Sequence, residues 1–424
     1  MNLVLFASIM SFFIQNLLAF LKFRKIVNPI SIFTVIHFFH NWSFSFSRYF
    51  NEFIFWRADN NVTYDTINEV LFINLIGSWA FFTAILLFAK SADYKVYTKL
   101  NNLSYLLNGY YALSAISLYR IFINYSSSLP YGADQALDSI SAFDPISRLI
   151  FFRVIFCSIY LICSKVSIKT FLKILFIEIF FSIITFDRKE ILYIVMSFFT
   201  KILISSQVNI KNVLKYSAMA ISGLIFFTFI PIYRSIDYVD GFRNILNETL
   251  VVITDYGSYI LFYILNLANS EGVQNWAYQL VENGEMSLLY GKSYLQAFIN
   301  MFVLRVFQGE TISSWQAAYH FKNVAYPNVD NQGWDFTFTA EAIQNFGFTY
   351  SFISFLFLGL FISYLYSNRN RSDLIQSLYI FSWPVLIVAF RMDSTSMFRL
   401  YSYVFLTFLI FYLTNNTQKI EKEN

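Results

Sequence analysis

Apolar runs of about 20 residues recur along the whole chain, separated mostly by short polar connections. An α-helix rises about 1.5 Å per residue, so each run is long enough to cross the roughly 30 Å hydrocarbon layer of a membrane. The pattern predicts an all-α, polytopic integral membrane protein. Its eleven predicted spans are residues 2–21, 29–47, 69–89, 104–124, 148–164, 170–186, 190–206, 216–233, 343–366, 374–391 and 397–414.

One connection, residues 234–342, is long and only partly polar. Within it, residues 250–267 and 288–306 are each apolar enough to be a twelfth span. One added span would reverse the side of every later connection, so we expect interfacial or re-entrant helices there. The chain thus divides into an N-terminal transmembrane bundle (1–233), a large outer loop (234–342) and C-terminal spans with a short tail (343–424).

The basic residues predict the orientation of the spans. The connections on one side hold 16 basic residues against 4 acidic ones, and a positive excess marks the cytoplasmic side. The amino terminus is therefore predicted to lie outside and the carboxyl terminus in the cytoplasm. Composition agrees with a membrane protein, since 57% of residues are hydrophobic and 13% charged, which excludes a soluble globular chain. Cys157 and Cys163 fall within one span and indicate neither a disulfide framework nor a metal site.

The two basic residue types are separated by side. The inner connections hold 13 Lys and 3 Arg, whereas the outer side holds 11 Arg and 3 Lys. Lysines on the inner side fit retention in the cytoplasm, but retention does not explain outer arginines. A guanidinium is always charged and matches phosphate with a fixed fork of donors. We therefore expect an arginine-lined outer cavity for a phosphorylated substrate, built from Arg120, Arg148, Arg153, Arg188, Arg234, Arg243, Arg305, Arg391 and Arg399. Considered one at a time, the side chains of Arg120 and Arg153 could instead extend to the lipid headgroups.

A charged tetrad, residues 187–190, lies between two predicted spans. It includes Arg188 and Lys189. The helix from Lys173 to Asp187 covers only about 21 Å, so the turn is expected to end below the outer surface, where charges face a watery cavity or one another. The tetrad is therefore either part of a binding site or a hairpin turn whose charges pair internally.

Glu341 is the leading candidate for a general base. It stands where the long loop re-enters the membrane, at the start of a predicted helix. The helix dipole alone favours a carboxylate there, and burial would suit the same carboxylate to proton transfer. Asp255, Asp335 and Asp393 are weaker candidates for this role.

Other polar residues inside spans have structural explanations. Glu178 is expected to bond a neighbouring helix. His37 and His40, three residues apart, are expected to be packed or hydrogen-bonded rather than metal ligands. No glycine-rich phosphate loop or nucleophile elbow is present, so any reaction must be driven by the substrate itself, with no cofactor and no metal.

Three stretches make the chain resemble the Wzy family of O-antigen and capsule repeat-unit polymerases. They are ITFDRKEIL (183–191), YGKSYLQAFINMFVLRVF (290–307) and FTFTAEAIQNFG (336–347). In the family, the first has an Arg in a short turn, the second a Gly-x-Ser/Thr-Tyr pattern followed by an Arg, and the third a Glu before Asn-Phe-Gly. The likeness covers about residues 180–400. The chain departs from the family where Leu304, rather than a proline, precedes Arg305.

The resemblance implies a membrane glycosyltransferase with a GT-C-like fold. Such an enzyme moves a growing glycan from undecaprenyl diphosphate to the next lipid-linked repeat unit, at the outer face of a bacterial cytoplasmic (inner) membrane. It implies Glu341, Arg188 and Arg305 as catalytic residues. The expected substrate-binding residues are Arg120, Arg153, Lys189, Arg234, Tyr294, Arg391 and Arg399. The expected partners are the undecaprenyl-diphosphate-linked oligosaccharide, the lipid bilayer and a chain-length regulator, without nucleic acid.

Two other functions, and a third possibility of a catalytically silent membrane scaffold, fit the same sequence. An O-antigen ligase uses the same donor with a lipid A-core acceptor. A flippase or exporter would carry the same lipid-linked glycan, although transporters commonly show internal repeats, and none is evident here.

Overall fold

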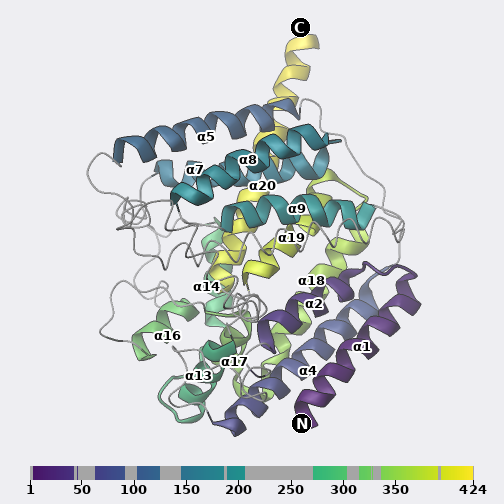
Figure 1. The fold of residues 1–424 in the computed structure, drawn as a ribbon, viewed down its shortest axis with the longest axis vertical. Coiled ribbons are helices and arrows are strands. Elements are labelled where there is room, and N and C mark those ends of the chain that lie inside the picture. Colours follow the sequence, from purple (N-terminus) through teal and green to yellow (C-terminus); the bar gives the residue numbers. More distant parts are fainter. Residues whose placement is uncertain are drawn as a thin grey trace, which may run out of the picture. The chain divides into compact units, whose positions relative to one another are not determined.

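The computed structural model describes nine stretches of the chain and two single residues: residues 3–42, 45, 63–90, 103–124, 145–185, 189–205, 271–302, 315–325, 327, 336–389 and 393–423. All secondary structure within them is helical (Figure 1). The helices are α1 (Leu3–Phe23), α2 (Pro29–Asn41), α4 (Tyr64–Phe88), α5 (Ser104–Asn124), α7 (Pro145–Cys163), α8 (Ile168–Thr185), α9 (Lys189–Ser205), α13 (Glu271–Glu282), α14 (Lys292–Phe302), α16 (Ala317–Ala325), α17 (Phe338–Tyr350), α18 (Phe352–Asn368), α19 (Asp373–Ala389) and α20 (Ser394–Glu423).

By length and composition, three helices of the described stretches suffice to cross a membrane: Leu3–Phe23, Tyr64–Phe88 and Ser394–Tyr412. A fourth span results if the bent pair α17 and α18 is counted as one. These helices indicate a membrane-embedded protein. Ten of the eleven predicted spans coincide with a described helix or bent pair, and span 216–233 lies outside the described residues. The count of eleven stays a prediction.

Helix α1 exposes large apolar side chains and buries several polar ones, unlike a helix on the surface of a soluble protein. Phe13 is 61% exposed, while the buried face meets α4 through polar groups. Gln15 donates to Ser78 Oγ over 3.2 Å, and Trp79 Nε1 donates to Ser11 Oγ over 3.0 Å. Lipid gives no hydrophobic drive for helices to associate, so small and polar residues hold such contacts together. This explains why α1 carries polar side chains on its buried face and large apolar side chains on its exposed face.

Helices α4 and α18 pack closely because glycines stand at the crossing. A Cβ on Gly359 would lie 2.8 Å from the carbonyl oxygen of Phe81, and one on Gly77 would lie 2.6 Å from the ring of Phe355. Ser363 Oγ donates to the carbonyl of Ala84 over 3.2 Å. Small residues at an interface let two backbones approach in this way. The contact fixes α18, and with it the end of the broken helix described below.

The directions of neighbouring helices agree with the predicted alternation of spans. Helices α1 and α4 run parallel, since Gln15 meets Ser78 and Lys22 meets the carbonyl of Ile85. Helices α7 and α9 also run parallel, since Lys201 Nζ donates to Leu161 O over 2.8 Å. Both lysines lie at the carboxyl ends of the helices they bond, where a cation meets unpaired carbonyls and the negative end of the helix dipole. The membrane side that these ends face stays a prediction.

Residues 343–366, predicted as one span, are bent in the structure. Helices α17 and α18 meet at 117°. Gly347 has φ 66° and ψ −167°, a conformation essentially restricted to glycine. The span predicted here stays a prediction, and its bend could not be predicted, because hydropathy carries no information about a single glycine that leaves helical geometry.

By close contacts the chain forms two compact units. The first comprises Met1–Tyr94, Ala268–Arg371 and Val385–Phe405; the second comprises Lys95–Leu267, Ser372–Pro384 and Leu406–Asn424. The predicted division at residues 233 and 342 concerns sides of the membrane and stays a prediction.

Candidate functional site

The break at Gly347 is bridged by a loop from the predicted outer region. Ending a helix leaves carbonyl groups without their usual partners. The backbone N–H of Leu289 donates to Gln344 O, and that of Tyr290 donates to Asn345 O, each over 3.0 Å. The N–H of Gly291 donates to the Asn345 side chain over 2.9 Å. The first half of the broken helix and the start of α14 are therefore one hydrogen-bonded assembly.

The Glu341 carboxylate lies where three helices begin. Glu341 is in the first turn of α17, whose N-cap is Thr337. Ser293, the second residue of α14, donates its hydroxyl to Oε1 over 2.5 Å. Ser394, the first residue of α20, donates its N–H to Oε2 and its hydroxyl to Oε1, each over 2.6 Å. Helix N-termini favour a negative charge, so a carboxylate with 0% exposure is held by neutral donors and helix dipoles.

A second layer of amides and hydroxyls fixes this arrangement. Asn345 Nδ2 donates to Ser293 Oγ over 2.7 Å and to the carbonyl of Glu341 over 2.8 Å. Asp393 is 2% exposed, and one of its oxygens accepts from Gln316 over 2.9 Å. A second carboxylate beside Glu341 opposes its negative charge. The arrangement therefore suits a carboxyl group that both gives up and accepts a proton.

Nearby, a closed set of buried side chains ties α17 to α2, α4 and α13. Thr339 Oγ1 donates to Asn74 Oδ1 over 2.9 Å, and Asn74 Nδ2 donates to Gln274 Oε1 over 2.9 Å. Gln274 donates to Asn41 over 2.6 Å, and Asn41 in turn to His37 Nδ1 over 2.6 Å. His37 Nε2 then bonds the carbonyl of Asn74 over 3.1 Å. The prediction that His37 is hydrogen-bonded is confirmed, and the network anchors the helix that carries Glu341.

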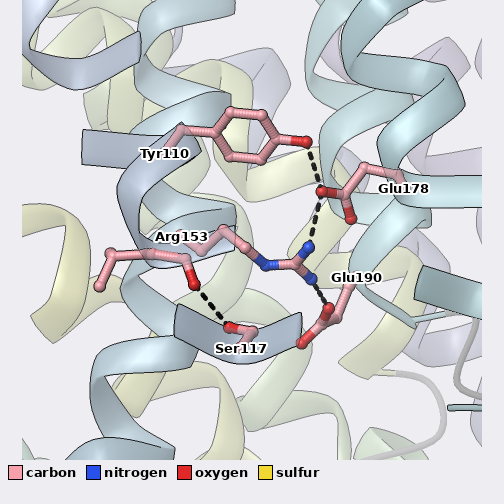
Figure 2. Close-up of polar contacts among 6 residues, drawn as sticks. Tyr110, Ser117, Arg153, Glu178 and Glu190 are labelled. Carbon is pink, nitrogen blue, oxygen red and sulfur yellow. Dashed lines mark hydrogen bonds and ion pairs between the residues drawn. The ribbon is translucent and has the colours of Figure 1, made fainter. Parts of the chain in front are cut away.

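The second unit holds a contrasting cluster, in which charge meets charge (Figure 2). Arg153 of α7 donates through Nη1 to Glu178 Oε1 of α8 over 2.9 Å. Its Nη2 donates to Glu190, in the first turn of α9. Tyr110 of α5 donates to the same Glu178 oxygen over 2.7 Å. The prediction that Glu178 bonds a neighbouring helix is confirmed, and its partners come from two helices.

Arg153 does not extend to the lipid headgroups. Its side chain is 0% exposed, as is that of Glu178, and the Glu190 side chain is 22% exposed. The Phe181 ring covers the guanidinium face, with Cζ 3.9 Å from the ring centroid. The alternative of a headgroup-directed Arg153 is therefore wrong. The tetrad is not wholly paired within itself either, because Glu190 bonds an arginine of another helix.

The predicted site residues divide between the two units and the undescribed stretches. Glu341, Tyr294 and Arg399 belong to the first unit, and Arg153 to the second. Tyr294 follows Ser293 on α14 and shares a 2.8 Å hydrogen bond with Ser354; Arg399 is exposed on α20. The side chains of Arg120 and Lys189, which lie in α5 and α9, are outside the description. Arg188, Arg234, Arg305 and Arg391 lie outside the described residues, as do Arg148's side chain, Arg243, Asp255 and Asp335.

The sequence did not point to Ser293, Ser394 or Tyr110 as site residues. Ser293 and Ser394 are 48 and 53 residues from Glu341 along the chain. Ser293 stands in one of the stretches that resemble the family, and that stretch was the available signal for it. Nothing in the local sequence singles out Ser394 or Tyr110.

Comparison of the chain with protein-family models, with curated proteins and with solved structures found no match.

Proposed function

We propose that this chain is a membrane glycosyltransferase that polymerises lipid-linked repeat units for O-antigen or capsule synthesis. It would transfer a growing glycan from undecaprenyl diphosphate to a hydroxyl of the next lipid-linked repeat unit. The observation that supports this most is the Glu341 carboxylate, which is fully buried at the start of a broken helix and held by three hydrogen bonds. Glu341 stands in a stretch that carries the resemblance to the Wzy family.

In this proposal Glu341 is the general base. It takes the proton from the acceptor hydroxyl while that oxygen bonds to the anomeric carbon of the donor. The bond from that carbon to the diphosphate oxygen breaks, and its electron pair leaves with undecaprenyl diphosphate. A carboxylate has about four acceptor positions. The three hydrogen bonds from Ser293 and Ser394 occupy three of them, which leaves one for the acceptor hydroxyl.

Arginines stabilise the departing diphosphate. Guanidinium groups aimed at developing charge lower the barrier, and they remain charged at any physiological pH. Arg188 and Arg305 take this role in the proposal, which therefore requires no metal ion. The substrate is bound by Arg120, Arg153, Lys189, Arg234, Arg391, Arg399 and Tyr294.

The proposal also sets the surroundings of the reaction. Both substrates carry polyprenyl chains, so they reach the enzyme through the bilayer of the bacterial inner membrane. The reaction takes place on the periplasmic side, where the amino terminus lies, and the carboxyl terminus is cytoplasmic. A chain-length regulator is the expected protein partner.

Two alternatives remain to be separated by experiment. The buried pair Arg153 and Glu178, with the partly exposed Glu190, favours a transporter of the same glycan, because ionisable residues within transmembrane helices are typical of ion and proton pathways. An O-antigen ligase would use Glu341 in the same chemistry with another acceptor.

The test uses the purified full chain in lipid nanodiscs with a synthetic undecaprenyl-diphosphate-linked repeat unit. A polymerase elongates the glycan and releases undecaprenyl diphosphate without any further addition. A ligase consumes the donor only when lipid A-core is supplied. A flippase gives no new glycosidic bond with either acceptor but moves a fluorescent substrate across proteoliposomes, and that result would overturn the proposal.

A further inference from the structure

The two edges of the Arg153 guanidinium are used differently. On one edge Nη1 donates to Glu178 Oε1, which also accepts from Tyr110. Arg153, Glu178 and Tyr110 are all 0% exposed. This side of the cluster joins three helices, and its three side chains are not exposed to solvent. It holds Arg153 in one orientation.

The other edge is only half occupied. In a guanidinium, Nε–H and one N–H of Nη2 point in the same direction and form a fork that fits two oxygens of one anion. Nη2 donates to Glu190, but Nε of Arg153 is buried and has no hydrogen-bond partner among the residues that the structure describes. Burying an unpartnered donor costs free energy. A bidentate oxyanion in place of Glu190 would satisfy both donors.

Glu190 is placed to leave this edge. It stands in the first turn of α9 and its side chain is 22% exposed, so it reaches water that Glu178 does not. Among the described side chains, one guanidinium faces two carboxylates here, so this described part of the cluster holds more acidic than basic groups. A carboxylate that is partly hydrated already loses little when it swings out. An anion arriving at the same place would also meet the positive end of α9.

We propose that the Nε and Nη2 edge of Arg153 is a binding site for the diphosphate group of a polyprenyl-linked substrate, and that Glu190 occupies it when no substrate is bound. The chemical class of the ligand rests on the proposed function. The two-donor edge of Arg153, with one donor bonded to Glu190 and the other unpartnered among the described residues, does not depend on that function. Glu178 and Tyr110 hold Arg153 in position. Glu190 acts as an internal competitor that the substrate displaces.

The two carboxylates of one cluster then have opposite effects on binding. Glu190→Gln removes the competing charge, and binding of diphosphate should tighten about tenfold, the equivalent of roughly one charge-assisted hydrogen bond. Glu178→Gln weakens the orientation of Arg153, and binding should loosen. Arg153→Lys keeps the positive charge but lacks the two parallel N–H donors of the guanidinium. The double variant Arg153→Lys, Glu190→Gln should therefore not show the tighter binding of diphosphate that Glu190→Gln alone produces. A purely structural cluster gives no tightening in any variant.

The experiment measures the dissociation constants of undecaprenyl diphosphate and of inorganic pyrophosphate for the full chain in nanodiscs. The site is supported if Glu190→Gln binds undecaprenyl diphosphate more tightly than the wild type and the double variant Arg153→Lys, Glu190→Gln does not. This holds whether or not pyrophosphate also binds more tightly. Tightening for pyrophosphate alone overturns the lipid-linked ligand. Equal or weaker binding of both probes by Glu190→Gln overturns the site. Because Glu190 is partly exposed, the Glu190→Gln variant should fold. If Glu178→Gln does not fold, Tyr110→Phe is a milder test of the same cluster. We expect Tyr110→Phe to bind diphosphate more weakly, and tighter binding would contradict the proposal.

The outcome is separable from that of the proposed function. If Glu190→Gln tightens binding while Glu341→Gln still elongates glycan, the base assignment fails and the anion site stands. If Glu190→Gln has no effect on binding while Glu341→Gln abolishes elongation, the anion site fails and the proposed function stands.

Discussion

The two units bury charge by opposite means. In the first, Glu341 is surrounded by hydroxyl and backbone N–H donors at helix N-termini. In the second, Arg153 is bonded to two carboxylates. Neutral donors stabilise a carboxylate while leaving it able to accept a proton, whereas an ion pair fixes both charges. For this reason our proposals give the Glu341 cluster the role in chemistry, and the Arg153 cluster the role of holding helices and an anion.

The largest effect expected from this comparison is on activity. Glu341→Gln keeps the shape of the side chain but removes the base, so glycan elongation should fall about 10²- to 10⁴-fold. In cells, the readout is the length of glycan chains at unchanged protein level. Glu285→Gln, an exposed carboxylate on the loop before α14, is the matched control and should leave chain length unchanged. Long glycan chains in cells whose only copy of the protein carries Glu341→Gln would contradict the role of Glu341 as the base.

The next effect is on stability. Arg153→Met leaves the buried charge of Glu178 without its arginine counter-ion, with only the hydrogen bond from Tyr110 remaining. This should cost about 3–5 kcal/mol of folding free energy. Thermal unfolding in nanodiscs measures it, with the exposed Lys173→Met as control. The triple variant Arg153→Met, Glu178→Gln, Glu190→Gln should recover part of the loss, since no uncompensated charge remains. A Tm of Arg153→Met equal to that of the wild type would show that the ion pairs hold nothing together.

Much of the helix layout was predictable, because it depends on hydrophobicity along the chain. The span predicted at 69–89 is α4 (Tyr64–Phe88), and the one predicted at 170–186 is α8 (Ile168–Thr185). The bend at Gly347 was missed because a glycine is compatible with both a straight helix and a break. Its conformation depends on Leu289 and Tyr290, which bond the freed carbonyls from a distant loop.

The candidate site was predictable only in part. Glu341 stood out as a charge at a membrane boundary, and Glu178 as a charge within a span. Their partners are set by packing between helices far apart in sequence, which a single sequence does not reveal. Arg153 illustrates this point. In the sequence, an arginine at this position is compatible with a contact to a lipid headgroup or to substrate, whereas its buried position in the structure depends on Glu178, 25 residues away.

Single hydrogen bonds in the two clusters should differ in their consequences. Tyr110→Phe removes one donor to the Glu178 carboxylate and should lower folding free energy by about 1.5–3 kcal/mol. Its neighbour Tyr111→Phe is the control, because the described hydrogen bond to Glu178 comes from Tyr110. Chemical denaturation compares the two. An equal midpoint for both variants would contradict the role given to Tyr110.

The smallest effect belongs to Ser293→Ala. It removes one of three hydrogen bonds to Glu341 and should slow elongation about tenfold, the equivalent of roughly 1.4 kcal/mol. The exposed Ser287→Ala, six residues earlier, should leave the rate unchanged. Both rates come from the nanodisc assay with the synthetic repeat unit. A Ser293→Ala variant as fast as Ser287→Ala would show that this hydroxyl does not support the base.

The central claim is that the Glu341 carboxylate accepts the proton of the acceptor hydroxyl. The most direct test is the pH dependence of the single-turnover elongation rate, measured for the wild type and for Glu341→Gln. The account predicts that the wild-type rate falls about tenfold for each pH unit on the acid side, as expected for loss of a base, and that the variant is at least about 100-fold slower with no such fall. A variant that keeps the acid-side fall, or a rate within threefold of the wild type, would contradict it.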